Sequence, residues 1–139
     1  TRFKDQKNSV HLEEYYKTDP KWINDDLGSK WDKILDLRHS VTNSMEEKRK
    51  NGEIGSSLEA KIFLEVDENN FSLLENLNLA EIFICSEVEL IKNSNSKEDF
   101  VKVVSEKASG MKCQRCWKIT TGTNPDTNLC VRCSAVIEK

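Results

Sequence analysis

Four cysteines near the C-terminus constrain this chain more than any other feature. They form two Cys-x2-Cys pairs, Cys113/Cys116 and Cys130/Cys133, separated by thirteen residues. Each pair folds as a tight knuckle with two thiolates on one side, and two knuckles complete a tetrahedron around Zn²⁺. The turn-rich segment 120–128 has almost no apolar content and would not bury enough surface to fold without metal. We therefore predict one structural Zn²⁺, whose closed shell of four thiolates leaves no open position for catalysis.

Other uses of cysteine fit the sequence less well. Disulfides need an oxidising compartment, for which the sequence carries no signal. A redox-active pair is normally a single motif in a βαβ setting. Cys85 stands apart within an apolar stretch, so we predict a buried core thiol there rather than a ligand.

Composition excludes a membrane span and favours a small polar protein. The 139 residues are 32% charged and 37% hydrophobic, and the mean hydropathy is −0.64. The longest apolar run, residues 82–85, is far shorter than the roughly 18–20 residues of a transmembrane helix. The first residues lack the apolar core of a signal peptide. We expect a cytoplasmic protein with no membrane contact, and, because no Met opens the chain, a piece cut from a longer one.

Charge is distributed unevenly along the chain. The net charge is −3, but residues 110–139 hold five basic and two acidic residues, so that they carry +3 and residues 1–109 carry −6. Zinc with four thiolates would add −2 and reduce the +3 to about +1. Such asymmetry is a reason to look for a polyanion site at the C-terminus.

A set of basic and aromatic residues surrounds the cysteines. Its members are Lys112, Arg115, Trp117, Lys118 and Arg132. Such sets bind single-stranded nucleic acid, because cations meet phosphates and an indole stacks on an unpaired base. The alternative is that Trp117 caps the small core of the metal site and the cations are solvated. The spacing alone does not separate these two interpretations.

The strongest periodic segment predicts a long helix over about 25–51. Asn24, Asp25 or Asp26 caps its start, and Asn51-Gly52 ends it. Its apolar stripe consists of Leu27, Trp31, Ile34, Val41 and Met45. At 1.5 Å per residue the helix is a rod of roughly 40 Å. A rod of that length projects beyond a small core, so we expect it to pack on other helices.

The period then changes to two, which predicts a small sheet. Strands are predicted over 58–66, 82–90 and 100–104, with a short helix over 71–77. The expected fold class is α+β: a long helix with the remnant of a helical bundle, a three-stranded sheet with one helix, and a C-terminal four-cysteine finger. We find no Ser/His/Asp set, no paired carboxylates and no Gly-rich nucleotide loop, and His11 and His39 are isolated. We therefore expect no catalytic residue.

The segment Gly110–Trp117, followed by Cys130–Cys133, resembles the C-terminal zinc finger of bacterial isoleucyl-tRNA synthetases, which are class I aminoacyl-tRNA synthetases. The resemblance continues upstream in the order of that family, over about residues 9–134. The segments that carry it are 9–15, 31–38 with Val41, 54–60 and 80–90. The thirteen-residue segment between the knuckles is shorter than is usual in that family, a departure that leaves the metal ligands in place.

The resemblance implies a function for each part of the chain. Residues 1–53 would end a helical anticodon-binding domain, 54–109 would form a small α+β junction domain, and 110–139 the zinc finger. The implied role is to hold the anticodon stem-loop of tRNA(Ile) while upstream domains of a monomeric ligase use ATP to attach isoleucine. The catalytic signatures of that family, His-Ile-Gly-His and Lys-Met-Ser-Lys-Ser, are absent here, so the chain should bind no ATP and be inactive alone. The four cysteines carry over as zinc ligands, and Arg115 and Trp117 as family positions beside the metal.

Two alternatives remain for the C-terminal finger. Formamidopyrimidine-DNA glycosylases end in a similar zinc finger that grips DNA, but they need an N-terminal proline where this chain has Thr1. The third possibility is a zinc adaptor that binds protein. Binding to the tRNA(Ile) anticodon stem-loop, to abasic duplex DNA or to no nucleic acid separates the three.

Overall fold

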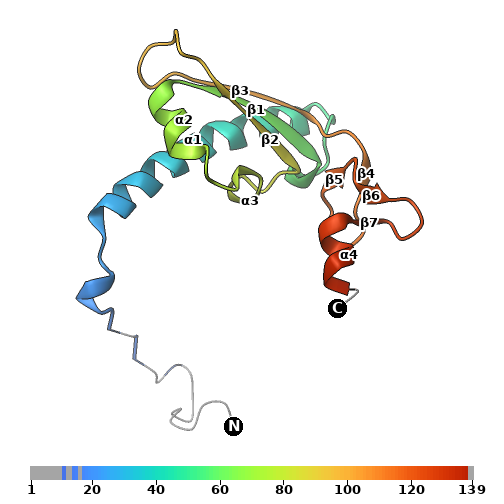
Figure 1. Ribbon diagram of the computed structural model, residues 1–139, viewed down its shortest axis with the longest axis horizontal. Coiled ribbons are helices and arrows are strands. Elements are labelled where there is room, and N and C mark those ends of the chain that lie inside the picture. Colours follow the sequence, from blue (N-terminus) through green and yellow to red (C-terminus); the bar gives the residue numbers. More distant parts are fainter. Residues whose placement is uncertain (1–10, 12–13, 16, 138–139) are drawn as a thin grey trace.

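The computed structural model describes residues 11, 14–15 and 17–137. Residues 1–10, and with them most of the segment 9–15 that carries the resemblance, lie outside this part of the chain. The described chain is a small α+β body followed by a cysteine-containing finger, as expected (Figure 1). The body contains η2 Pro20–Trp22, α1 Asp25–Lys50, η3 Ser57–Glu59, β1 Ala60–Val66, α2 Glu68–Leu74, α3 Leu79–Ile82, β2 Glu87–Lys92 and β3 Val101–Lys107. The finger, defined here as residues 110–137, contains β4 Met111–Lys112, β5 Ile119–Thr120, β6 Thr123–Asn124, β7 Leu129–Cys130 and α4 Val131–Ile137.

Helix α1 begins and ends where the sequence predicts. The side chain of Asn24 accepts a hydrogen bond from the Leu27 N–H at 2.9 Å and so satisfies one of the free donors of the first turn. At the other end Gly52 adopts a left-handed φ of 73°, which glycine reaches without steric cost. The helix predicted over about 25–51 is therefore confirmed.

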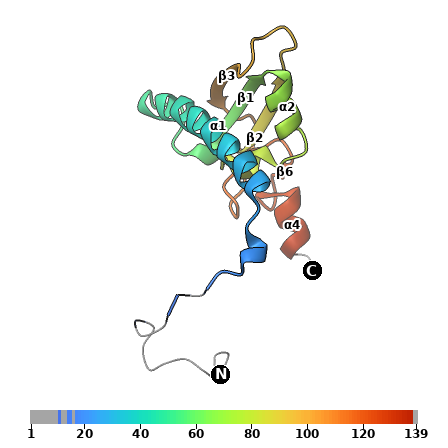
Figure 2. The same cartoon turned by 90° about the vertical axis from the view of Figure 1, so that its left-hand side faces the viewer.

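The three-stranded sheet has the order β2-β1-β3, with β1 parallel to β2 and antiparallel to β3. A parallel pair needs a crossover connection, which α2 and α3 supply. Alternate residues of β1 are buried, and they form one core with the apolar side of α1 and with side chains of α2 and α3. Viewed along the long axis of the molecule, α1 lies across one face of the sheet (Figure 2).

The strand predicted over 82–90 is wrong in its first half. Residues 79–82 form α3, Ile84 has a positive φ of 55°, and β2 begins only at Glu87. Phe83 and Cys85 are buried while Ile84 is 48% exposed, the reverse of the predicted alternation. The physical reason is the crossover: the chain must turn here before β2 can run parallel to β1. Cys85 is a buried thiol, as predicted, but in a turn, and burial raises its pKa to about 11.

Smaller differences concern element boundaries and the helix stripe. The first strand begins at Ala60 after a short 3-10 turn, the third runs to Lys107, and α3 is a second helix beside the sheet. Within α1, Ile34, Leu37, Val41 and Met45 are buried, whereas Leu27 and Trp31 are 50% and 41% exposed. Leu37 belongs to the buried side although the predicted stripe omits it. The body beneath α1 is too short to cover its first turns.

Among the described residues, no helix combines the length and the apolar character that crossing a bilayer requires.

The packing of α1 can be tested at two neighbouring positions. Ile34 is fully buried, whereas Leu35 is 46% exposed. Ile34→Ala should lower the free energy of unfolding by about 2–5 kcal/mol, because it removes buried methylenes and leaves a cavity. Leu35→Ala, the control, should change it by less than about 1 kcal/mol. Urea unfolding followed by circular dichroism measures both, and equal losses would contradict the described packing.

Candidate metal centre

The first knuckle lies in the turn between β4 and β5, which pair antiparallel. The N–H of Cys113 donates to the carbonyl of Lys118 at 2.9 Å, and the N–H of Trp117 donates to the carbonyl of Cys113 at 2.8 Å. Trp117 adopts a left-handed φ of 66° to close this turn. These bonds place Cys113 and Cys116 on the same side of the turn.

The second knuckle begins at the end of β7 and continues into α4. Cys130 is the last residue of β7, and Cys133 lies in the first turn of α4. The turn before it is closed by Asn124, whose side chain accepts from the N–H of Asp126 at 2.8 Å. The carbonyl of Asn128, at a left-handed φ of 54°, accepts from the Gln114 N–H at 3.0 Å and so ties the two knuckles together.

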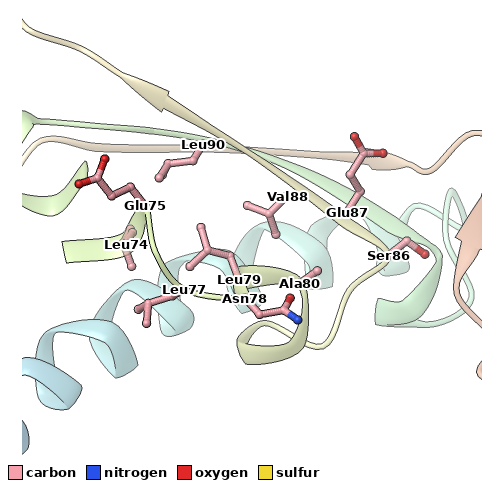
Figure 3. Close-up of a pocket in the computed structure, with 10 residues that line it drawn as sticks. All are labelled: Leu74, Glu75, Leu77, Asn78, Leu79, Ala80, Ser86, Glu87, Val88 and Leu90. Atoms are coloured by element: carbon pink, nitrogen blue, oxygen red, sulfur yellow. The ribbon is translucent and has the colours of Figure 1, made fainter. Parts of the chain in front are cut away.

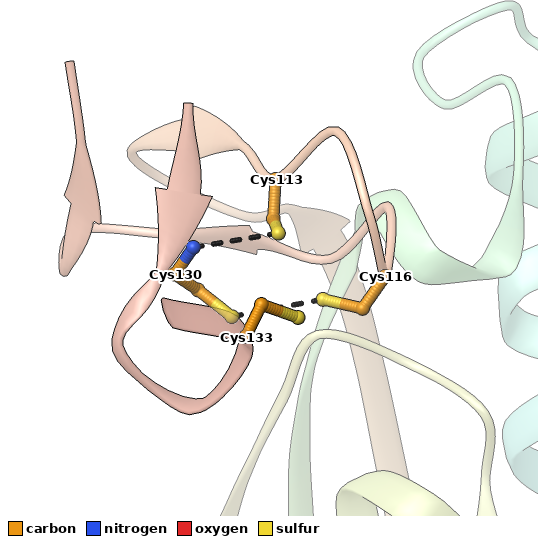
Figure 4. A group of neighbouring side chains, drawn as sticks. All are labelled: Cys113, Cys116, Cys130 and Cys133. Atoms are coloured by element: carbon orange, nitrogen blue, oxygen red, sulfur yellow. Dashed lines mark hydrogen bonds between the residues drawn. The ribbon is translucent and has the colours of Figure 1, made fainter. Parts of the chain in front are cut away.

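The four cysteines converge on one point (Figure 4). Their sulfur atoms all lie within 4.8 Å of one another; Cys113, Cys130 and Cys133 are buried, and Cys116 is half-buried. The Sγ atoms of Cys116 and Cys130 are 3.8 Å apart. A tetrahedron with metal–sulfur bonds of about 2.3 Å has edges of about 3.8 Å, so this spacing fits a four-thiolate site. The residues can therefore hold a metal ion, and all five cysteines are free thiols rather than disulfides.

The environment of the cluster shifts the pKa values of two of its cysteines in opposite directions. Burial acts to raise the pKa of Cys113, but backbone N–H groups of Cys116, Cys130 and Arg115 outweigh it and lower this pKa to about 6. Burial raises the pKa of Cys116 to about 12, and the neighbouring cysteine sulfurs contribute to the rise. Metal binding must displace protons, because only thiolates are ligands.

Gly110 sets the path of the chain into the finger. Its φ is +117°, and a Cβ added there would lie 2.4 Å from the carbonyl oxygen of Thr120. Any other residue would therefore meet both backbone strain and a steric clash at the β4–β5 pair. In the sequence, Gly110 is recognisable only as the last of three small residues, 108–110, that precede the cysteines.

Side chains of the body hold the finger in place. Lys112 forms an ion pair with Glu59 at 3.0 Å, and Arg132 one with Glu81 at 3.3 Å. The N–H of Ile119 donates to Ser86 Oγ at 2.7 Å. Sequence reasoning missed all three body residues, because each partner is more than thirty positions away along the chain.

Glu59 also closes a local turn of the body. Its carboxylate accepts from the N–H of Gly55 at 3.0 Å. This hydrogen bond and the one from Lys112 hold the pKa of Glu59 below its usual value. The carboxylate is therefore ionised at neutral pH and able to hold Lys112.

The five predicted nucleic-acid-binding residues separate into two groups. Lys112 and Arg132 are bound to carboxylates of the body. Arg115 is exposed, Lys118 is half-buried, and neither has an ion pair among the residues that the structure describes. Trp117 is 61% exposed, which leaves most of the indole in solvent rather than over the cysteine core.

A hollow away from the cysteine cluster lies between α2, α3 and β2 (Figure 3). Leucine and valine side chains make up much of its lining, and its two carboxylates, Glu75 and Glu87, stand at opposite ends. The two carboxylates are therefore not adjacent to each other in this hollow.

The fold and the cysteine cluster together define a small α+β body with a C-terminal finger whose four cysteines can hold a metal ion. No family model matches the chain. It is similar to isoleucine–tRNA ligases of Natranaerobius thermophilus (36% identity over 96% of this chain), Crocosphaera subtropica (37% over 93%) and Pelagibacter ubique (38% over 84%). The chain belongs to the isoleucine–tRNA ligase family and corresponds to its C-terminal region. It spans only 12–16% of the length of these relatives.

The role of Gly110 can be tested against a second glycine. Gly110→Ala should destabilise the finger by about 1–3 kcal/mol, since the residue is forced into a left-handed conformation against the backbone of Thr120. Gly28→Ala in α1 should instead stabilise the chain by about 0.5–1 kcal/mol, because nothing lies within 4 Å of the added Cβ. Thermal unfolding of the metal-loaded chain measures both. A neutral Gly110→Ala would contradict the described geometry.

Proposed function

We propose that this chain is the part of an isoleucine–tRNA ligase that holds the anticodon stem-loop of tRNA(Ile). The observation that carries the proposal is the similarity of almost the whole chain to isoleucine–tRNA ligases. In this proposal the remaining domains of a monomeric cytoplasmic enzyme bind ATP and isoleucine and perform the aminoacylation. The chain itself supplies no catalytic residue and is inactive alone.

In this proposal three segments of the chain have separate roles. Residues 1–53 end the helical anticodon-binding domain, 54–109 form the junction domain and 110–139 form the zinc finger. The shared core of α1 and the sheet supports a rigid connection between the first two segments. The ion pairs of Lys112 and Arg132 support a defined position of the finger on this body.

The metal in the finger is proposed to be a single Zn²⁺, held by Cys113, Cys116, Cys130 and Cys133. An all-sulfur tetrahedral set suits zinc, and it closes the coordination shell so that the ion is structural. Its contribution is to join two knuckles whose connecting segment has few apolar side chains. The finger then keeps the exposed residues near the metal in one arrangement.

The proposed RNA contacts are made first by Arg115, Trp117 and Lys118. An exposed indole next to a guanidinium can stack on an unpaired base of the loop while the cation meets a phosphate. Lys112 and Arg132 remain candidates, but their pairing with Glu59 and Glu81 lowers the positive charge that they offer to RNA. We therefore rank Lys112 and Arg132 below the other three residues as proposed RNA contacts.

Removing a ligand should release the metal and unfold the finger. Purified chain is expected to contain about one zinc ion, and Cys113→Ser or Cys130→Ser should lose it and melt the finger first, because zinc binding supplies the folding free energy of such modules. Elemental analysis and circular dichroism provide the measurements. Cys85→Ala removes a buried thiol outside the cluster and should keep the zinc. Protein purified without chelators that held no zinc would overturn the assignment.

Truncating the exposed residues should weaken tRNA binding by the full-length ligase. Trp117→Ala is expected to cost about 1–3 kcal/mol through the loss of one stacked base. Arg115→Ala should weaken binding and reduce the slope of log K against log salt by about 1. Filter binding of tRNA(Ile) over a salt series measures both.

Lys97→Ala is the matched charge control for this experiment. Lys97 is exposed and belongs to the loop between β2 and β3. That loop lies at the end of the sheet away from the finger (Figure 1). Its removal should leave tRNA affinity unchanged. Unaltered affinity in both finger variants would remove Arg115 and Trp117 from the interface. Preference for abasic duplex DNA would favour the glycosylase-like alternative, and binding to no nucleic acid would favour a protein adaptor.

A further inference from the structure

The N-terminal half of α1 exposes an apolar stripe. Leu27 is 50% exposed, Trp31 41% and Leu35 46%. All four buried residues of this 26-residue helix lie at or after position 34. The first turns of α1 extend past the end of the sheet (Figure 1).

This stripe continues the buried side of the same helix. Leu27 and Met45 are eighteen positions apart, which is five turns at 3.6 residues per turn, so they lie on one line along α1. Trp31 follows Leu27 after about one turn. Met45 on this line is buried against the sheet, and Leu27 is exposed because the sheet does not reach it.

The opposite side of the same turns is polar. Ser29, Asp32 and Asp36 lie about half a turn away from the line of Leu27 and Trp31. The N-terminal half of α1 is therefore amphipathic, and the residues of its apolar side are 41–50% exposed. An amphipathic helix of this kind is typical of one that packs on a neighbour.

A buried donor without a partner lies close to the same line. Arg38 follows Trp31 after about two turns, and its Nε is shielded from solvent. Among the described residues no acceptor reaches this atom. Shielded donors without a hydrogen bond are rare in complete proteins. A neighbour packed along this side of α1 could present a carbonyl or carboxylate towards which the guanidinium turns.

We infer that the stripe of Leu27, Trp31 and Leu35 is the docking surface for the region that precedes this chain in the longer ligase. The inference rests on the proposed function for the identity of that longer protein. The relatives are about six times as long as this chain, so that most of the ligase lies outside it. Since the chain corresponds to the C-terminal region, the preceding region joins it at the end where α1 begins, and the connection keeps it at high local concentration.

The charges of this half of α1 favour protein over RNA as the occupant. Residues 25–36 contain four aspartates and two lysines. A net negative charge repels phosphates, whereas apolar side chains with one arginine suit the apolar side of other helices. The occupant is thus a segment of the same polypeptide that presents apolar side chains and one acceptor for Arg38.

Cysteine labelling can test this surface directly. Leu27→Cys is compared with Ser29→Cys, a nearly isosteric control on the polar side, in the 139-residue chain and in the full-length ligase. The native cysteines offer little competition, because one is buried in the core and four belong to the metal cluster. Site-specific modification by N-ethylmaleimide is followed by mass spectrometry of peptides.

The expected result is a contrast between the two variants. Leu27→Cys should react at least about tenfold more slowly in the full-length ligase than in the 139-residue chain, because docking must open before the thiol is exposed. Ser29→Cys should react at the same rate in both. Leu35→Cys provides a second position on the stripe and should follow Leu27→Cys.

Three results would overturn the inference. They are equal rates for Leu27→Cys in the two proteins, protection that needs added tRNA, and protection in the 139-residue chain that grows with its own concentration. The last two would assign the surface to RNA or to a second copy. Aminoacylation of tRNA(Ile) by the unmodified full-length protein is measured separately. A lack of aminoacylation would contradict the proposed function. The difference in labelling rates would still test the docking surface, because it does not depend on that activity.

Discussion

The buried side of β1 is the constraint on which the rest of the molecule depends. Ala60, Ile62, Leu64 and Val66 are fully buried, and they fix the register of both neighbouring strands. The position of β1 also determines where Ser86 lies, because the N–H of Ser86 donates to the carbonyl of Ala60 at 3.0 Å. Ser86 Oγ in turn accepts from the N–H of Ile119 in the finger, so the apolar core of the body also positions the finger with its four-cysteine cluster.

The finger itself depends on a different interaction. Its core consists of the cysteines with Leu129, which is too little apolar surface to order such a segment by burial alone. A metal ion bound by the four thiolates would supply the folding free energy that burial does not. Arg115 and Trp117 are exposed and are not part of this core.

Local patterns predicted those features that depend on neighbours in the chain. The cap at Asn24, the stop at Gly52 and the burial of alternate residues in β1 each follow from a few adjacent residues. The segment around Ile84 could not be predicted in this way. Its apolar alternation fits a strand, and only the need to cross over between parallel strands makes it a helix and a turn.

The candidate site likewise combines features that local sequence determines with features that only the tertiary structure determines. The spacing of the cysteines by itself determined which four side chains meet, because a knuckle is a local structure closed by bonds between near neighbours. Only the tertiary structure decided which cations are available to a ligand: Lys112 and Arg132 meet Glu59 and Glu81, which lie about fifty positions away. It also decided that Leu27 and Trp31 are exposed, because the extent of the sheet, and not the period of the helix, sets where burial ends.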